Sequence, residues 1–499
     1  MSMLSPEELE RLTSAESLFP SPIPVQSVSS DEFMPLPQNP KQREFEARVK
    51  EIGTRMSRRL GVSRRRFFQT AAGMASAFLA MNDTYGPLFG VSRAEAATPE
   101  KADERAKQLS GQFIMDMHTH FLRPGTKIMA FVAQRAAVGK AGWNPALTGK
   151  EQTIEDLMFA NYIKEMYLDS DTKIACISGA PSEIPDDWFL TNEMKAQARA
   201  SVNAIAGTKR MMSHAIFTPG YDGWMEQVDR AIEVLKPDSM KGYTIGDNSH
   251  KDLSKHPWNL DDEKLVYPAY AKFLKAGLKN VCIHKGLFPP SVEKQFPHLL
   301  AHSDVRDVGK AAKDWPQLNF IIYHGGYRWP GGGSATDGWK QFEETGRVEW
   351  VSDLADIPAR FGVKNVYADV GQLFAQSTIA EPRLSAVMMG ILIKGMGADH
   401  VCWGTDAIWT GAPQWQIEAL RRLEIPEDLQ KKHGFKPLGP ADGPVKNAIF
   451  GGNNARLYNI KPRLRAEIRN DKMAQYKEIY DKHGAGRTNL AYGYALKSS

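Results

Sequence analysis

From about residue 110 onward, short apolar runs alternate with longer segments of mixed character. Each run is rich in Val, Ile, Met, Phe or Tyr and ends in polar residues or glycine. The longer segments, such as DGWMEQVDRAIEVLK and PAYAKFLKAGL, carry apolar residues three and four positions apart, which is typical of helices with one buried face. The pattern predicts eight strands separated by helical sequence: 113–118, 173–178, 211–217, 239–245, 280–286, 319–325, 365–371 and 400–406.

Strands that alternate with helices indicate a parallel sheet. Eight such units in about 350 residues predict an α/β fold, a (β/α)8 TIM barrel with enlarged loops. An open doubly wound sheet is less favoured, because no Gly-rich phosphate-binding turn follows the first strand. The Gly-rich segment GGYRWPGGGS follows the sixth run and lacks the lysine of a P-loop. We assign the barrel to residues 98–460 and the polar remainder, 461–499, to a C-terminal arm.

The chain before the barrel has a different character. Residues 1–62 are rich in Pro, Ser and Glu, so we expect a disordered leader. Residues 63–97 resemble a twin-arginine export signal: the segment 63–69, SRRRFFQ, fits the motif Ser-Arg-Arg-x-Phe-Leu-Lys except in its last two places. A weakly apolar segment, 70–81, follows, and Ala94-Glu95-Ala96 offers a small-x-small cleavage site before Ala97. These features predict export by the twin-arginine machinery to the periplasm or beyond.

Charge and cysteine content exclude two classes of function. The chain of 499 residues carries a net charge of +5, and much of the positive charge lies between Lys41 and Arg66. The remainder is nearly neutral, so we expect no nucleic-acid partner. The three cysteines, Cys176, Cys282 and Cys402, lie far apart in predicted strands, which indicates buried thiols rather than disulfides or a cysteine zinc site.

Several predicted strands end in ionisable side chains. The active site of a TIM barrel lies at the carboxyl ends of its strands. There the sequence places Asp116, His118 and His120 on the first strand, His284 on the fifth, His324 on the sixth and Asp406 on the eighth. Alternate strand residues point the same way, so His118 and His120 can face one ion. With His284 and Asp406 they would bind Zn²⁺ or a similar divalent ion and leave a position for water.

Structural roles are the alternative for each of these residues. A histidine at a strand end is often only a hydrogen-bonding residue. Asp116 could orient an imidazole or could cap the end of its strand.

The order of these motifs is similar to that of the amidohydrolase superfamily. The segments MDMHTHF, IHKG, IIYHGG and WGTDAIW resemble its amidohydrolase-related branch, which includes aminocarboxymuconate semialdehyde decarboxylase. VKNAIFGGNNARLYNI is similar to the closing helix of that branch, and the resemblance covers about residues 111–460. It implies one metal ion bound by His118, His120, His284 and Asp406, with His324 beside it as a catalytic base or electrostatic partner.

Lys241 on the fourth predicted strand bears on the number of metal ions. Binuclear members of the superfamily carry a carbamylated lysine on this strand, so a second ion held with His284 and His324 is the less favoured alternative. Lys241 could instead bind a substrate carboxylate or pair with an acidic neighbour. Further candidate substrate contacts are side chains near the strand ends that could grip a carboxylate or wall a flat, apolar pocket: Arg123, Arg328, Tyr243, Tyr327, Trp329 and Trp409.

The expected chemistry follows from a bound divalent ion. Such an ion lowers the pKa of its water toward about 7 and polarises a carbonyl group, while Asp406 or His324 moves the proton. The leading expectation is an exported hydrolase that cleaves an amide, ester or lactone. The alternative is a non-oxidative decarboxylase of an aromatic or enoic acid, and a further alternative is a non-catalytic periplasmic ligand-binding barrel. Zn²⁺ is the expected ion, although Mn²⁺ and Fe²⁺ suit the same ligands. The resemblance also implies a small carboxylated or aromatic substrate and a homodimer.

Overall fold

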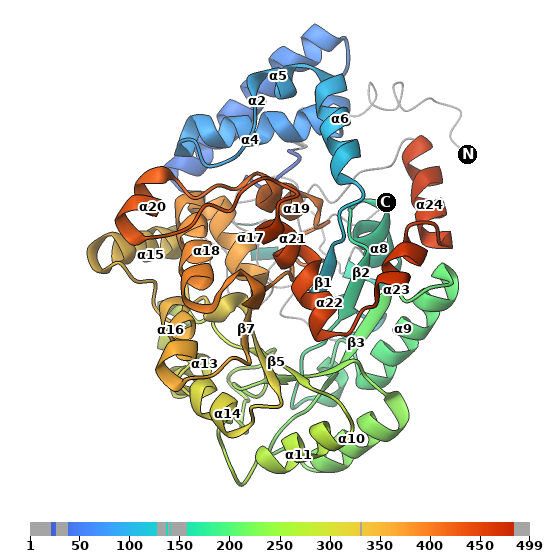
Figure 1. The fold of residues 1–499 in the computed structure, drawn as a ribbon, viewed down its shortest axis with the longest axis vertical. Helices are drawn as coiled ribbons and strands as arrows, with labels where there is room; N and C mark the ends of the chain where they lie inside the picture. Colours follow the sequence, from blue (N-terminus) through green and yellow to red (C-terminus); the bar gives the residue numbers. More distant parts are fainter. Residues whose placement is uncertain are drawn as a thin grey trace.

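Eight parallel strands form the centre of the molecule, in the order β1 to β8. The computed structural model describes residues 21–25, 38–126, 136–137, 140, 157–329 and 332–483 (Figure 1). Each strand coincides with one of the predicted runs, and the (β/α)8 barrel is therefore confirmed. The strands are β1 Met115–Thr119, β2 Ile174–Ile177, β3 Met211–Ile216, β4 Ser239–Tyr243, β5 Asn280–His284, β6 Asn319–Tyr323, β7 Val366–Asp369 and β8 Val401–Cys402.

Backbone hydrogen bonds between the segments around β8 and β1 bring the two ends of the sheet together. The Met117 amide donates to the Trp403 carbonyl at 3.1 Å, and the Asp406 amide donates to the His118 carbonyl at 2.9 Å. A parallel bridge between Thr119 and Ala407 continues this pairing. The loop that follows β8 is thus fixed against the carboxyl end of β1, which places Asp406 beside the two histidines of the first strand.

Alternation along the strands decides which side chains reach the inside of the ring. On β5, Val281 and Ile283 belong to the outer core shared with the helices, whereas Cys282 packs in the cluster inside the ring. His284, two residues after Cys282, therefore points inward as well. All three cysteines are buried free thiols, as predicted.

Helices follow the strands and pack around the ring. Those before β8 are α8 Phe159–Ile163, α9 Asn192–Ala206, α10 Trp224–Arg230, α11 Tyr267–Lys275, α12 Pro290–Gln295, α13 Leu300–Ser303, α14 Val308–Asp314, α15 Gly332–Thr345, α16 Val351–Phe361, α17 Gly371–Ala380 and α18 Pro382–Met396. After β8 come α19 Gln414–Arg422, α20 Glu427–His433, α21 Pro444–Asn447 and α22 Asn453–Leu457. In the described part of the chain, no helix combines the length and apolar character needed to span a bilayer.

The C-terminal segment packs on the barrel through two helices, α23 Pro462–Ile468 and α24 Lys472–Lys482 (red in Figure 1). Asp471, which caps α24, forms a two-pronged ion pair with Arg210 at the start of β3, with both N–O distances 2.7 Å. The predicted arm is therefore docked on the barrel as far as residue 483, and residues 484–499 lie outside the described part.

Among the residues that the structure describes, five helices precede the first strand of the barrel: α2 Pro40–Leu60, α3 Arg64–Phe68, α4 Ala71–Tyr85, α5 Arg93–Ala97 and α6 Pro99–Leu109. We call them the N-terminal layer (blue in Figure 1). The structure differs here from the expected disordered leader, because α2 buries Phe45, Val49, Ile52 and Met56, which recur at helical spacing. Residues 1–20 and 26–37 of the leader lie outside the described part.

The predicted export signal also lies within the N-terminal layer. Phe67 and Phe68 of the twin-arginine motif are buried, and the apolar segment forms α4, which packs against α2. Partly buried ion pairs join this layer to the barrel helix α19. Glu95 on α5 contacts Arg422 at 2.6 Å, and Arg105 on α6 contacts Glu418 at 2.8 Å. The layer is thus held to the barrel by both apolar and charged contacts.

Candidate metal centre

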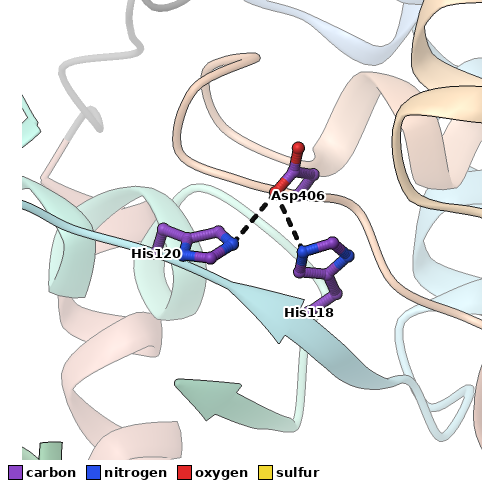
Figure 2. Close-up of side chains that lie close together, drawn as sticks. All are labelled: His118, His120 and Asp406. Atoms are coloured by element: carbon purple, nitrogen blue, oxygen red, sulfur yellow. Dashed lines mark ion pairs between the residues drawn. The ribbon is translucent and has the colours of Figure 1, made fainter. Parts of the chain in front are cut away.

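His118, His120 and Asp406 converge at the carboxyl ends of β1 and β8 (Figure 2). Asp406 Oδ1 lies 3.1 Å from Nε2 of His118 and 3.1 Å from Nε2 of His120. All three side chains are buried, and their donor atoms lie close enough together to hold one metal ion. Two imidazoles and a carboxylate around one point are a donor set that suits Zn²⁺, Mn²⁺ or Fe²⁺. Three of the four predicted ligands are therefore brought together.

His284, the fourth predicted ligand, lies beside His324. Nδ1 of His284 is 3.2 Å from Nε2 of His324, and His284 is not part of the donor group around Asp406. The backbone N–H of Gln372 donates to Nδ1 of His324 at 3.1 Å. His324 Nδ1 is therefore an acceptor, so the neutral ring carries its proton on Nε2 and donates it to His284. The role of His284 as a metal ligand stays a prediction.

Both predicted catalytic residues have an unusual backbone conformation. His324 and Asp406 adopt positive φ values of 59° and 57°, which are uncommon for residues other than glycine. The conformation of Asp406 is supported by Gln372, whose side-chain amide donates to Asp406 Oδ2 at 2.9 Å. Strained residues of this kind occur most often at functional sites. Gln372, the second residue of α17, therefore contacts both candidate catalytic side chains.

Asp369, at the carboxyl end of β7, is a site residue that our sequence analysis missed. Its Oδ1 lies 3.1 Å from His118 Nδ1 and accepts the His324 backbone N–H at 3.3 Å. His118 thus faces Asp406 with Nε2 and Asp369 with Nδ1. A carboxylate on the far nitrogen fixes the orientation and tautomer of a metal-binding imidazole. The signal that could have revealed Asp369 is its place at the end of the seventh predicted strand, which matches that of Asp406 at the eighth.

Asp116 has a structural role: its contacts are with the backbone and with Thr405. Its carboxylate accepts the backbone N–H of His118 at 3.0 Å and that of Thr405 at 3.1 Å, and it also accepts the Thr405 hydroxyl. These contacts join β1 to the loop that follows β8. Asp116 is the second of the five residues of β1 and so does not cap the strand end; its buried carboxylate holds in register the two segments that carry His118 and Asp406.

Burial controls the protonation of the site. It lowers the pKa of His118, His120, His284 and His324 well below the ordinary value, and the nearby charge of Lys241 lowers each of them further. These imidazoles are held neutral, which is the form that binds a metal. Burial also raises the pKa of Asp406 to about 7. A cation at this point would be the favourable partner for that carboxylate.

Aromatic rings stand against two of the site histidines. Trp409 stacks on His120, with ring centroids 5.3 Å apart and planes inclined by 19°. Tyr243 stacks on His284 at 4.8 Å and 17°. Phe189 meets His120 edge to face at 5.8 Å. Of the four predicted aromatic contacts, Tyr243 and Trp409 therefore lie at the site, whereas Tyr327 lies in the main hydrophobic core and Trp329 packs against it.

The two predicted arginine contacts are engaged elsewhere. Arg123 donates to the backbone carbonyls of Trp188 at 3.0 Å and Asp186 at 2.6 Å. Arg328 forms ion pairs with the carboxylates of Glu293 and Glu349. Their guanidinium groups therefore fix loops.

Lys241 is buried within the ring. Its ammonium lies 3.2 Å from the centroid of the Tyr323 ring and 5.1 Å from that of Tyr243. These contacts are cation–π interactions. A second ion bound through Lys241 stays a prediction.

Solved structures of low identity resemble this chain. One is 5-carboxyvanillate decarboxylase from Sphingomonas paucimobilis, with 15% identity and a TM-score of 0.39, covering 70% of this chain and 100% of that one. A dihydroxybenzoic acid decarboxylase from a Polaromonas species, with bound manganese and 2-nitroresorcinol, has 14% identity and a TM-score of 0.39, covering 71% and 99%. A probable 2-pyrone-4,6-dicarboxylic acid hydrolase from Acinetobacter baumannii has 12% identity and a TM-score of 0.37, covering 70% and 99%.

Sequence comparison gives the family directly. No curated protein sequence matches this chain. The family model described as amidohydrolase matches residues 115–460, a region that begins with β1 and ends beyond the last barrel helix. That region contains every residue of the metal centre and all eight strands. The chain belongs to the amidohydrolase family.

Proposed function

We propose that this chain is a metal-dependent enzyme that removes CO₂ from a small aromatic carboxylic acid without an oxidant. The observation that carries the proposal is the pair of aromatic rings, Trp409 and Tyr243, stacked on His120 and His284 next to the metal-binding donor group. Flat rings that flank a cation site suit a flat, anionic substrate. We place decarboxylation before hydrolysis, which reverses the order expected from the sequence.

His118, His120 and Asp406 would hold the ion, which when bound would polarise oxygen atoms of the substrate. Decarboxylation replaces CO₂ by a proton at a ring carbon, so the site must supply one proton in each turnover. His324 is suited to that task, because Gln372 occupies its Nδ1 and leaves the proton on Nε2. A proton from solvent, passed through His284 whose Nδ1 contacts that nitrogen, would restore His324 for the next turnover.

Hydrolysis is the second candidate, and one observation favours it. Gln372 holds Asp406 Oδ2, while Oδ1 faces both imidazoles. A carboxylate fixed in this way could take the proton from a water molecule that attacks an ester or lactone. A non-catalytic barrel is disfavoured, because a purely structural pair would not need the strained backbone of His324 and Asp406.

The test is a product assay on the metal-loaded full chain. We would incubate it with 2,6-dihydroxybenzoate, 5-carboxyvanillate and 2-pyrone-4,6-dicarboxylate, and measure released CO₂, the decarboxylated phenol and the ring-opened acid. Release of CO₂ together with the phenol is the expected result. Ring opening of the pyrone without CO₂ would replace the proposal by hydrolysis. Asp406→Asn serves as the inactive control, and elemental analysis of the purified protein identifies the ion.

A further inference from the structure

Lys195 carries a buried amine that has no role in the metal centre described above. It lies in the first turn of α9, where a lysine usually reaches solvent, yet its side chain is completely buried. Within the described part of the chain, its Nζ has no hydrogen-bond partner. An amine without a partner in the interior costs free energy, so such groups are rare unless a ligand or a reaction requires them.

The amine of Lys195 lies at the carboxyl end of β2, on the same side of the barrel as the metal centre. A Cβ atom built on Gly179, just after β2, would lie 3.5 Å from Lys195 Nζ. The Tyr243 hydroxyl donates to the Gly179 carbonyl at 3.0 Å. The charge of Lys195 also reaches His120, whose pKa is lowered first by burial, then by Lys241 and Lys195. Lys195 therefore lies next to Gly179 and near Tyr243, the ring that stacks on His284.

The acidic residue nearest in sequence does not neutralise Lys195. Glu193, two residues earlier, forms an ion pair with Arg230 at 2.9 Å. The neighbouring thiol of Cys176 is held neutral, because burial raises its pKa well above the ordinary value. The two arginines expected to bind a substrate carboxylate, Arg123 and Arg328, are engaged by loop carbonyls and by glutamates.

We propose that Lys195 binds a carboxylate group of the substrate. This inference rests on the proposed function and specifies the anchor for its anionic substrate. Burial lowers the pKa of Lys195 to about 7, so the amine without a ligand is only partly protonated at neutral pH. A carboxylate beside the amine would favour its protonated form and supply the missing hydrogen-bond partner.

The test compares two ligands that differ only in the carboxylate: 2,6-dihydroxybenzoate and resorcinol. Their dissociation constants would be measured by calorimetry on metal-loaded wild type and on Lys195→Met, which removes the amine and keeps a similar volume. We expect the variant to bind 2,6-dihydroxybenzoate about 10–100-fold more weakly and resorcinol equally well, because a charge-assisted hydrogen bond is lost only with the acid. Lys264→Met, at an exposed lysine, is the control for loss of charge.

Three results would contradict the proposal that Lys195 binds the carboxylate. An equal loss of affinity for both ligands indicates a structural role, and an unchanged affinity for the acid shows that the amine does not contact it. If wild type binds neither ligand, the proposed substrate class fails and this inference fails with it. Metal content and the unfolding midpoint of each variant, measured in parallel, separate loss of the anchor from loss of the fold.

A different observation carries a second inference, which concerns the predicted cleavage site. Ala94-Glu95-Ala96 lies within α5, Ala96 is buried, and the Ser76 hydroxyl on α4 donates to the Ala96 carbonyl at 3.4 Å. The two terminal guanidinium nitrogens of Arg422, Nη2 and Nη1, donate to the Glu95 carboxylate at 2.6 and 3.2 Å. Proteolysis favours exposed, flexible segments, and this one is helical and anchored.

We infer that residues 40–96 stay attached to the folded protein instead of being removed by cleavage before Ala97. Twin-arginine export carries proteins that are already folded, so the N-terminal layer would be assembled before any peptidase meets it. Intact-protein mass spectrometry of the active chain, purified separately from periplasm and cytoplasm, tests this. A mass that includes the N-terminal layer is expected in whichever fraction holds the activity. An active species that begins at Ala97 would overturn the inference.

Discussion

The imidazole of His118 lies between two carboxylates, and the one on its far side is Asp369, with 3.1 Å between His118 Nδ1 and Asp369 Oδ1. Asp369 is completely buried, and burial raises its pKa well above the ordinary value. Its contact with the ring orients Nε2 toward Asp406. The geometry of the metal centre therefore depends on a residue that does not belong to the donor group around Asp406.

Replacement of Asp369 by Asn is expected to weaken metal binding about 10–100-fold, because an amide is a weaker acceptor for the His118 ring N–H than the carboxylate that a cation bound to His118 would favour. Titration of the metal-free protein with Mn²⁺ or Zn²⁺ against a chelating dye measures the change. Asp399→Asn is a matched control, since Asp399 also lies 3.1 Å from a histidine nitrogen but is largely exposed. Equal affinities in wild type and Asp369→Asn would show that His118 needs no such support.

Gly404→Ala is expected to disrupt the metal centre sterically. A Cβ atom at this position would lie 1.9 Å from Asp369 Oδ2 and 2.6 Å from His118 Cβ. Relief of that clash must move one of these side chains, and overpacking of this kind costs about 1–3 kcal/mol of unfolding free energy. Gly111→Ala, where a Cβ atom meets nothing within 4 Å, is the control. Denaturant unfolding and metal titration should separate the two variants clearly.

The ion pair between Glu95 and Arg422 predicts that the N-terminal layer contributes to stability. Glu95→Gln should lower the unfolding free energy by about 1–3 kcal/mol, because Arg422 is buried and loses a charged partner. Glu51→Gln removes a carboxylate from the exposed pair with Arg48 and should change it by less than about 1 kcal/mol. Similar values for both variants would mean that the layer is only loosely associated.

Glu418 predicts how stability falls in acid. Burial alone would raise its pKa, but Arg422, Arg421 and Arg105 outweigh burial and hold the pKa of the folded protein well below the ordinary value. The unfolded chain binds this proton more readily, so the contribution is fully present above about pH 4.5 and is lost as the pH falls below that value. Between pH 7 and pH 3.5, wild type should lose more unfolding free energy than Glu418→Gln does.

Exposed carboxylates provide the comparison for this acid effect. Glu427→Gln, at an exposed ion pair with Lys431, should leave the acid dependence of wild type unchanged. If Glu418→Gln follows wild type over the whole range, the arginines around Glu418 do not set its acid response.

The strands and the histidines were readable from the sequence because both depend on local patterns. Each strand is a short apolar run, and the residue that ends it must lie at the mouth of the barrel. Asp369 obeys the same rule, but the ligand pattern of the resemblance includes no residue on the seventh strand, and Asp369 was therefore overlooked. The ion pairs of Arg328 could not be predicted from the sequence, because Glu293 and Glu349 lie 35 and 21 residues away along the chain. Such contacts depend on how the loops fold.

The N-terminal layer shows where composition misleads. Residues 40–60 are rich in charge, yet Phe45, Val49, Ile52 and Met56 form a continuous apolar stripe. The stripe predicts a helix with one apolar face, but it does not show which other part of the chain packs against that face. That surface comes from helix α4 of the same layer, whose weakly apolar sequence also resembles a signal peptide.

Helix α17 is buried along its whole length. At its start, Gln372 positions His324 and Asp406, and near its end the Ile379 carbonyl accepts the side-chain amide of Gln42 from α2 at 3.5 Å. A recombinant fragment that begins at residue 115, where the family match starts, would keep every candidate metal ligand but would expose the outer end of this helix to solvent. Laboratories that choose such a fragment for crystallisation or screening should expect impaired catalysis from an apparently complete active centre.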